Sequence, residues 1–341
     1  MGRPPRARPA APPSRFQGRA ASKDELLPRT SRLPGQERKR RERLQRSSDV
    51  VTIDGVSVSR WQWAWEGVLG VITVLALGMV LVTTPTVHLL NILAQAAPLG
   101  LIAAGMALSL RTGVPNLAVG ALSALSGALV ATAVDVAELS LVAGLLLVLG
   151  LAAFAGLVLG AFTVLVAAPA WAVTLGAAMA CEAMLLAVTD GRAIPVEDRL
   201  PVPQLVWFAV FAVVSVGGGL LWARRDVRDW LSKGWTAGVV GLAGSSVLAA
   251  LGGFVLVMRL GVAQPASQGT LTTVFALAAV LLGGTSPNGE RGAVTGTLLS
   301  VLILAIVQGQ LAVLNAPLWI YSLILAVVVV AGLTVSRLLR A

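Results

Sequence analysis

The sequence predicts an all-α membrane protein, a polytopic bundle of about ten transmembrane helices that follows a disordered, basic N-terminal tail. Three observations predict this fold class. Charged residues make up only 12% of the 341 residues and hydrophobic residues 56%, whereas a soluble domain usually carries about 25% charge. The mean hydropathy is +0.84. Long apolar runs follow one another from residue 63 almost to the C-terminus, and this excludes an ordinary soluble enzyme.

The basic charge is concentrated before Trp61. Residues 1–60 hold 15 of the 26 Lys and Arg residues and only six acids, and they include the run from Arg38 to Arg43. Such a segment cannot bury enough apolar area to offset its chain entropy, so we expect it to be disordered. We therefore predict two parts, a cytoplasmic tail over 1–60 and a transmembrane domain over 61–341. The tail is expected to meet anionic membrane lipid, and nucleic acid is not expected as a partner.

Ten apolar runs are candidates for membrane spans, since a span needs about 20 apolar residues. The third and eighth runs are bounded by Gly and Pro, so we expect them to be broken or re-entrant. The runs cover residues 63–83, 88–110, 116–134, 139–167, 170–189, 204–222, 236–258, 270–284, 292–313 and 317–336.

Loop charge predicts the orientation. With the tail inside and ten crossings, eight basic residues fall on the inner side and three on the outer side, which places both termini in the cytoplasm of a multi-pass plasma (inner) membrane protein. The inner set is Arg111, Arg224, Arg225, Arg228, Lys233, Arg291, Arg337 and Arg340, and the outer set is Arg192, Arg199 and Arg259.

Several kinds of chemistry are excluded by residue counts. Cys181 and His88 are the only residues of their types, so a His-rich metal site is not expected. No Lys follows a Gly-rich loop, so the chain carries no phosphate-cradling P-loop. We predict no catalytic residues, no metal and no cofactor, and hence no enzyme.

Polar residues inside the spans are the candidates for a solute pathway. Glu182 is the one carboxylate placed deep in a predicted span, where it either lines a transport path or makes a structural contact with Arg111. Amides can hydrogen-bond neutral hydroxyls without placing charge in lipid, although they can equally join helices. The tentative pathway set is Asn91, Gln95, Asn116, Glu182, Gln264 and Gln308.

Glycines four residues apart recur along the spans. The pairs Gly156 with Gly160, Gly234 with Gly238 and Gly292 with Gly296 have the spacing that allows helix backbones to approach closely in lipid. They predict either a dimer interface or close packing within one chain.

Three sequence blocks carry a resemblance to one known family. MALSLRTGVPNLAVGALSALSG, from Met106 to Gly127, resembles that family's TGGIDLSVGS and ALSG signature. PAWAVTLGAAMACEAMLLAVTDGRAI, from Pro169 to Ile194, is similar to its PPFIVTLGTM block. GGFVLVMRLGVAQPASQG followed by AAVLLGGTSPNGERGAVTGT, within Leu251–Gly296, is similar to its AQP and VVLGGTSL stretch.

These blocks together resemble the ribose-type simple-sugar permeases of ATP-binding-cassette importers, and the resemblance implies a role that composition alone does not. Such permeases pair with a second permease subunit, identical or different, and are driven by two cytoplasmic ABC ATPase subunits. An extracytoplasmic solute-binding protein delivers the solute, usually a sugar. The departures from the family are Asn116 in place of an Asp, Arg111 in place of an aliphatic residue, and Glu182 close to a usual Arg. The last two together suggest a compensating Arg111–Glu182 pair.

The central inner loop is shorter than the family's, which implies a change in coupling to the ATPase. The family has some thirty residues there, whereas this chain has only ARRDVRDWLSKGW from Ala223 to Trp235. The charged residues of this loop either form a short amphiphilic coupling element or are a solvated loop, and the chain could be the weakly coupled half of a heterodimer. The alternative function is a diverged, non-transporting homologue that acts in assembly or regulation. The tentative coupling set is Arg224, Arg225, Asp226, Arg228 and Asp229.

Overall fold

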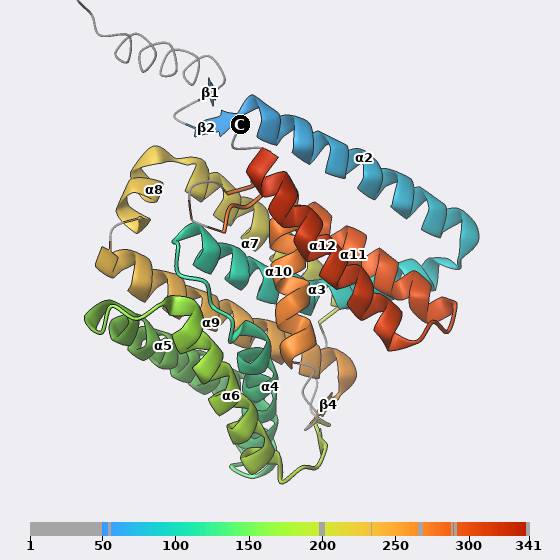
Figure 1. The fold of residues 1–341 in the computed structure, drawn as a ribbon. Helices are drawn as coiled ribbons and strands as arrows, with labels where there is room; N and C mark the ends of the chain where they lie inside the picture. Colours follow the sequence, from blue (N-terminus) through green and yellow to red (C-terminus); the bar gives the residue numbers. More distant parts are fainter. Residues whose placement is uncertain are drawn as a thin grey trace, which may run out of the picture. The chain divides into compact units, whose positions relative to one another are not determined.

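The computed structural model describes residues 50–53, 56–197, 202–232, 234–264, 269–287, 289 and 292–338 (Figure 1). Most of the predicted tail lies outside these residues. Its last part contributes strands β1 (Val50–Ile53) and β2 (Val56–Ser59), which pair antiparallel, and Arg60 begins the first described helix.

All ten predicted spans are helices in the structure. They are α2 (Arg60–Thr83), α3 (Thr86–Arg111), α4 (Val119–Asp135), α5 (Leu141–Leu165), α6 (Ala170–Thr189), α7 (Gln204–Ala223), α9 (Gly234–Leu260), α10 (Gly269–Leu282), α11 (Gly296–Val313) and α12 (Leu318–Leu338). Eight of these are long and apolar enough to cross a membrane, and the two shorter ones are α4 and α10. These correspond to the third and eighth runs, which were predicted to be broken or re-entrant; each is a single short helix, and the prediction of re-entry stays a prediction.

The lengths of α4 and α10 follow from the turns beside them. At 1.5 Å per residue the 14 residues of α10 reach only about 21 Å, less than the hydrocarbon core of a bilayer. Gly284 has a φ of +87°, which favours glycine, and it ends the helix. α4 begins late because residues 112–118 form a partly buried irregular segment before it, in which Gly113 has a φ of +76°.

The bundle has two ends, named here by their minor elements. At the α8 end, Trp65 of α2 donates to the Leu282 carbonyl oxygen at 2.8 Å, and Gly332 of α12 lies against Leu281. The short helix α8 (Arg225–Leu231) lies there, after α7. At the β3–β4 end, β3 (Ile194–Pro195) pairs antiparallel with β4 (Val262–Ala263) and joins the α6–α7 and α9–α10 connections. The beginning of α2 and the end of α12 thus lie at the same end of the bundle.

The helices differ in how much of their surface is covered. α3 is mostly buried, and α9 and α11 are about half buried, whereas in α2, α5, α6, α7 and α12 fewer than a third of the residues are buried. The exposed side chains of this outer set are large and apolar, as at Val74, Phe154 and Val327. Such a surface suits lipid rather than water.

Glycines allow α5 to lie directly against α9. A Cβ atom at Gly156 would come within 2.6 Å of the Leu242 carbonyl oxygen, and one at Gly160 within 2.7 Å of the Gly238 carbonyl oxygen. Three of the six glycines that sequence spacing singled out therefore serve this contact within the chain. Gly292 and Gly296 also have close neighbours within the chain, whereas Gly234 has none within 4 Å.

Candidate functional site

A polar cavity of about 180 Å³ lies toward the β3–β4 end. Five helices and one connection form its walls, so residues far apart in the sequence meet there. Its polar wall consists of Gln95 of α3, Ser123 of α4, Arg259 of α9, Gln264 after β4, Thr272 of α10 and Gln308 of α11. We call it the amide cavity, because three of these six side chains are carboxamides.

The polar groups of the amide cavity are only partly satisfied within the chain. Gln308 is half-buried, and its Oε1 atom has no hydrogen-bond partner in the described part of the chain. Arg259 donates from Nη2 to Asn91 Oδ1 at 2.9 Å, and no carboxylate among the described residues lies within ion-pair distance of it. A small solute with hydroxyl groups can supply the missing donors and acceptors.

Five of the six predicted pathway residues lie at or near this cavity. Gln95, Gln264 and Gln308 line it. Asn91 reaches it through its bond to Arg259. Glu182 lies behind its wall, since a Cβ atom at Gly269 would lie 3.1 Å from Glu182 Oε1 and Gly269 lines the cavity.

Asn116 lies away from the cavity, in the partly buried segment before α4. Its Nδ2 donates to Ser245 Oγ at 2.8 Å, and its Oδ1 accepts from the Ala118 backbone N–H at 3.1 Å. Its own backbone N–H donates to Ser109 Oγ at 3.1 Å. Because both ends of the amide are satisfied, this geometry favours a structural role, holding the turn between α3 and α4.

The predicted coupling residues lie on or next to α8, which has seven residues. Arg224, Arg225, Asp226 and Asp229 are exposed and Arg228 is half-buried, while Leu231 on the other face is buried. The short loop thus forms a short amphiphilic helix whose charged side chains are mostly exposed.

A second buried carboxylate, which the sequence analysis missed, lies at the α8 end. Glu66 of α2 is 4% exposed, and it accepts from the Val294 N–H at 2.9 Å, the Thr295 N–H at 2.9 Å and the Thr295 hydroxyl at 2.5 Å. Thr295 is the N-cap residue of α11, where a negative charge is favourable. The sequence signal that could have identified Glu66 is a carboxylate within an otherwise apolar helix.

The expected Arg111–Glu182 pair is wrong. Arg111 is buried and donates from Nη2 to the Ala293 carbonyl oxygen at 2.6 Å. The charged residue that interacts with it electrostatically is Glu66. Gln62 also bonds this loop, at the Gly292 carbonyl oxygen. Arg111 and Glu66 therefore fix the α10–α11 loop from two sides, whereas Glu182 lies near the start of α10. Sequence alone offered Glu182 as a partner because Glu66 had not been recognised as buried.

The comparison with known proteins agrees with this architecture. The model of the permease component of branched-chain amino acid transport systems matches residues 88–223. The ribose import permease RbsC of Escherichia coli (strain K12) is 30% identical over 283 residues, which cover 73% of this chain and 85% of the relative. RbsC of Bacillus subtilis (strain 168) is 31% identical over 283 residues, with 73% and 84% covered. The chain belongs to the ribose-type permease family of ABC importers.

More distant relatives extend the same comparison. This permease is 27% identical over 262 residues to the autoinducer 2 import system permease LsrC of Photorhabdus laumondii, with 70% of the chain and 78% of the relative covered. No solved structure matches it. The family assignment made from the three sequence blocks is confirmed. This family membership, together with the eight long apolar helices of this chain, indicates a multi-pass inner-membrane protein.

Proposed function

We propose that this permease is the membrane-spanning subunit of an ATP-dependent importer that translocates a sugar or a similar small polar solute across the plasma membrane. The observation that carries the proposal is the amide cavity, where Gln95, Gln264 and Gln308 converge from distant segments. Carboxamides both donate and accept, which matches sugar hydroxyls. The relatives named for ribose import favour the same solute class.

The volume of the cavity limits the solute to a small molecule. At about 180 Å³ it is smaller than pockets for drug-sized ligands, which hold about 300 Å³ or more. Ser123 and Thr272 add hydroxyls to its wall, and Arg259 adds a guanidinium already held by Asn91. A solute bound there would exchange its hydration for these groups, which favours a neutral polyhydroxyl compound.

The α8 end is proposed to face the cytoplasm. The exposed arginines Arg224 and Arg225 lie there, and so do the outer ends of α2 and α12. Since cytoplasmic loops carry an excess of Lys and Arg, this arrangement favours both termini inside. The amide cavity then lies toward the extracytoplasmic side, where a solute-binding protein would deliver its cargo.

We further propose that α8 is the contact for the cytoplasmic ATPase. Its charged face is exposed and its apolar face packs on the bundle. Because α8 contacts α7 and α9, a displacement of α8 by the ATPase would be transmitted directly to these two helices. A second permease subunit, identical or different, completes the transporter. The small size of α8 keeps a second candidate open: a non-transporting homologue that uses the same surface in assembly or regulation.

Co-purification in mild detergent from the native membrane tests this proposal. We expect a P-loop ATPase to co-purify with the tagged permease, and to be lost when Arg224, Arg225 and Arg228 are replaced by Ser. The matched control is Arg192→Ser, an exposed arginine at the opposite end. If no ATPase co-purifies with the unaltered protein, the importer proposal fails and the non-transporting homologue takes its place.

A further inference from the structure

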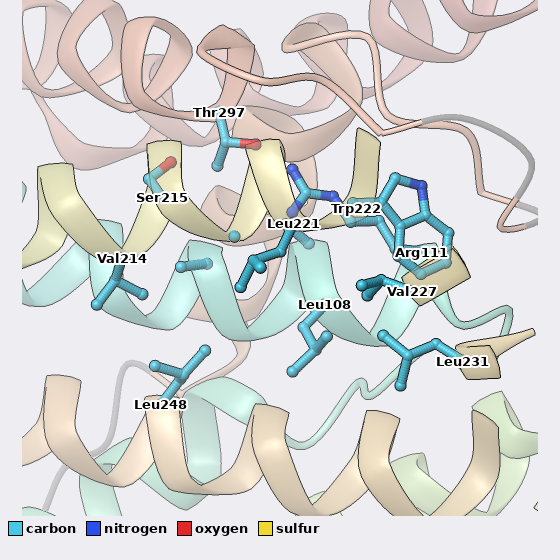
Figure 2. A pocket seen from close by; sticks show the side chains of 13 residues that line it. Leu108, Arg111, Val214, Ser215, Leu221, Trp222, Val227, Leu231, Leu248 and Thr297 are labelled. Atoms are coloured by element: carbon cyan, nitrogen blue, oxygen red, sulfur yellow. The ribbon is translucent and has the colours of Figure 1, made fainter. Parts of the chain in front are cut away.

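A second cavity, of about 240 Å³, lies toward the α8 end (Figure 2). We call it the α8-end cavity. Its walls come from α3, α7, α8, α9 and α11. Most of the lining side chains are apolar, among them Leu108, Val214, Val227, Leu231 and Leu248, so the cavity offers an apolar body to a ligand.

Four of the lining side chains carry buried polar atoms without a hydrogen-bond partner in the described residues. They are Arg111 Nε, Ser215 Oγ, Trp222 Nε1 and Thr297 Oγ1. Each of these residues is 5% exposed or less. Figure 2 shows them along one side of the cavity, opposite Val214, Leu108 and Leu248. Buried polar groups are nearly always satisfied, so four orphans around one cavity require an explanation.

The orphan groups share one chemical property. A guanidinium and an indole N–H can only donate, and a hydroxyl can donate as well as accept. The adjacent carboxylate, Glu66, is already bonded by Val294 and Thr295 of the α10–α11 loop, and it is not among the residues that line the cavity. None of the residues that line the cavity carries a carboxylate, and two of its four orphan groups can only donate, so donors outnumber acceptors there.

From this arrangement we infer that the α8-end cavity binds a compact aliphatic molecule that carries a carbonyl or carboxylate oxygen. The hydrocarbon part lies against the leucines and valines, and the oxygen accepts from the orphan donors after small side-chain rotations. Val227 and Leu231 of α8 form one wall, so a bound molecule fills the space behind α8 and holds this helix in place. The inference concerns a site distinct from the amide cavity and does not depend on transport.

Hydrogen–deuterium exchange on the full-length protein in detergent tests the site, with pentan-2-one, pentanoate and pentane as probes. We expect pentan-2-one or pentanoate to slow exchange within 225–231, and pentane at equal concentration to have a much smaller effect. A response to the ketone alone identifies a neutral ligand, and a stronger response to pentanoate identifies an anionic one. No slowing by either oxygen-bearing probe, or equal slowing by pentane, overturns the inference.

Two variants distinguish binding in the cavity from partition into the micelle. Ala107→Leu places extra atoms in the cavity and should abolish the response, whereas Ala152→Leu, which fills an apolar groove between α4, α5 and α6, should leave it unchanged. Thr297→Val keeps the shape and removes one donor, so the apparent affinity for the ketone should fall about fivefold. This variant also keeps the test decisive if Ala107→Leu fails to fold. An unaltered response in Ala107→Leu would place the probe elsewhere and contradict the inference.

Discussion

The amide cavity and the α8-end cavity lie toward opposite ends of one bundle, and α3, α9 and α11 contribute to both. The amide cavity presents side chains that donate and accept, and one of its walls is the exposed Gln264. The α8-end cavity presents donors against apolar walls and is closed by α8. The same helices thus offer a site for a polyhydroxyl solute at one end and for a small acceptor-bearing molecule at the other.

The difference shows what each end needs from its surroundings. At the β3–β4 end the cavity is shaped by the close approach of α4 and α9. The two helices lie so close that position 253, a glycine, has no space for a side chain beside the Ser123 carbonyl oxygen. At the α8 end buried charges shape it, because Arg111 and Glu66 hold the α10–α11 loop. Packing positions the first cavity and electrostatics position the second, so the two should respond to different substitutions.

The largest effect is expected from Gly253→Ala. A Cβ atom there would overlap the Ser123 carbonyl oxygen, so α4 and α9 must separate, at a cost of about 3 kcal/mol or more. The measurement is the thermal unfolding temperature of the purified protein in detergent. Gly150→Ala is the control, since a Cβ atom at Gly150 meets nothing within 4 Å. Equal stability of the two variants would show that this close approach does not shape the amide cavity.

A loss of about 3 kcal/mol is expected from Glu66→Ala. The substitution leaves the Val294 and Thr295 N–H groups unpaired and removes the only buried negative charge near Arg111 among the described residues. Thermal unfolding and hydrogen–deuterium exchange at 292–295 measure it. Glu138→Ala, at an exposed carboxylate, is the control. Unchanged exchange in this loop would contradict the role given to Glu66.

Gln308→Leu should lower the efficiency of sugar uptake about tenfold and leave the fold intact. The substitution removes an amide whose oxygen has no partner in the described part of the chain, so the protein loses no internal hydrogen bond to that atom. Gln310→Leu, two residues away and outside the cavity lining, should keep normal uptake. ATP-driven uptake at several sugar concentrations measures both. Equal losses would assign the effect to α11 rather than to the cavity.

The smallest effect is expected from Asn91→Leu. It removes the acceptor that holds Arg259 Nη2 at 2.9 Å, so Arg259 becomes less well positioned and the KM for uptake should rise about threefold to fivefold. Thr83→Val is the control, because the Thr83 hydroxyl bonds only within its own helix, to the Met79 carbonyl oxygen. A normal KM in Asn91→Leu would remove Arg259 from the solute site.

Much of the fold could be predicted from the sequence, because each described helix except α8 corresponds to one apolar run. The ends of α4 and α10 could also be predicted, because Gly and Pro residues bound the corresponding apolar runs. The convergence of Gln95, Gln264 and Gln308 could not be predicted, because it depends on how segments far apart in the sequence pack together. Nor could the environment of Arg111, whose fixed contacts come from the α10–α11 loop and from α2. In the sequence, Trp222 resembles an ordinary interfacial residue and Thr297 an ordinary helical one. Only the structure shows that both line the same cavity.

ATP-driven sugar uptake by proteoliposomes that contain this permease with its co-purified ATPase tests the central claim most directly. The account predicts saturable uptake of labelled ribose or a related sugar that requires ATP. A Gln95→Leu/Gln308→Leu double variant should lose this uptake and still bind the ATPase. Uptake that survives unchanged in the double variant would contradict a pathway through the amide cavity. The absence of any ATP-dependent sugar uptake by the unaltered complex would contradict the assignment as a sugar importer.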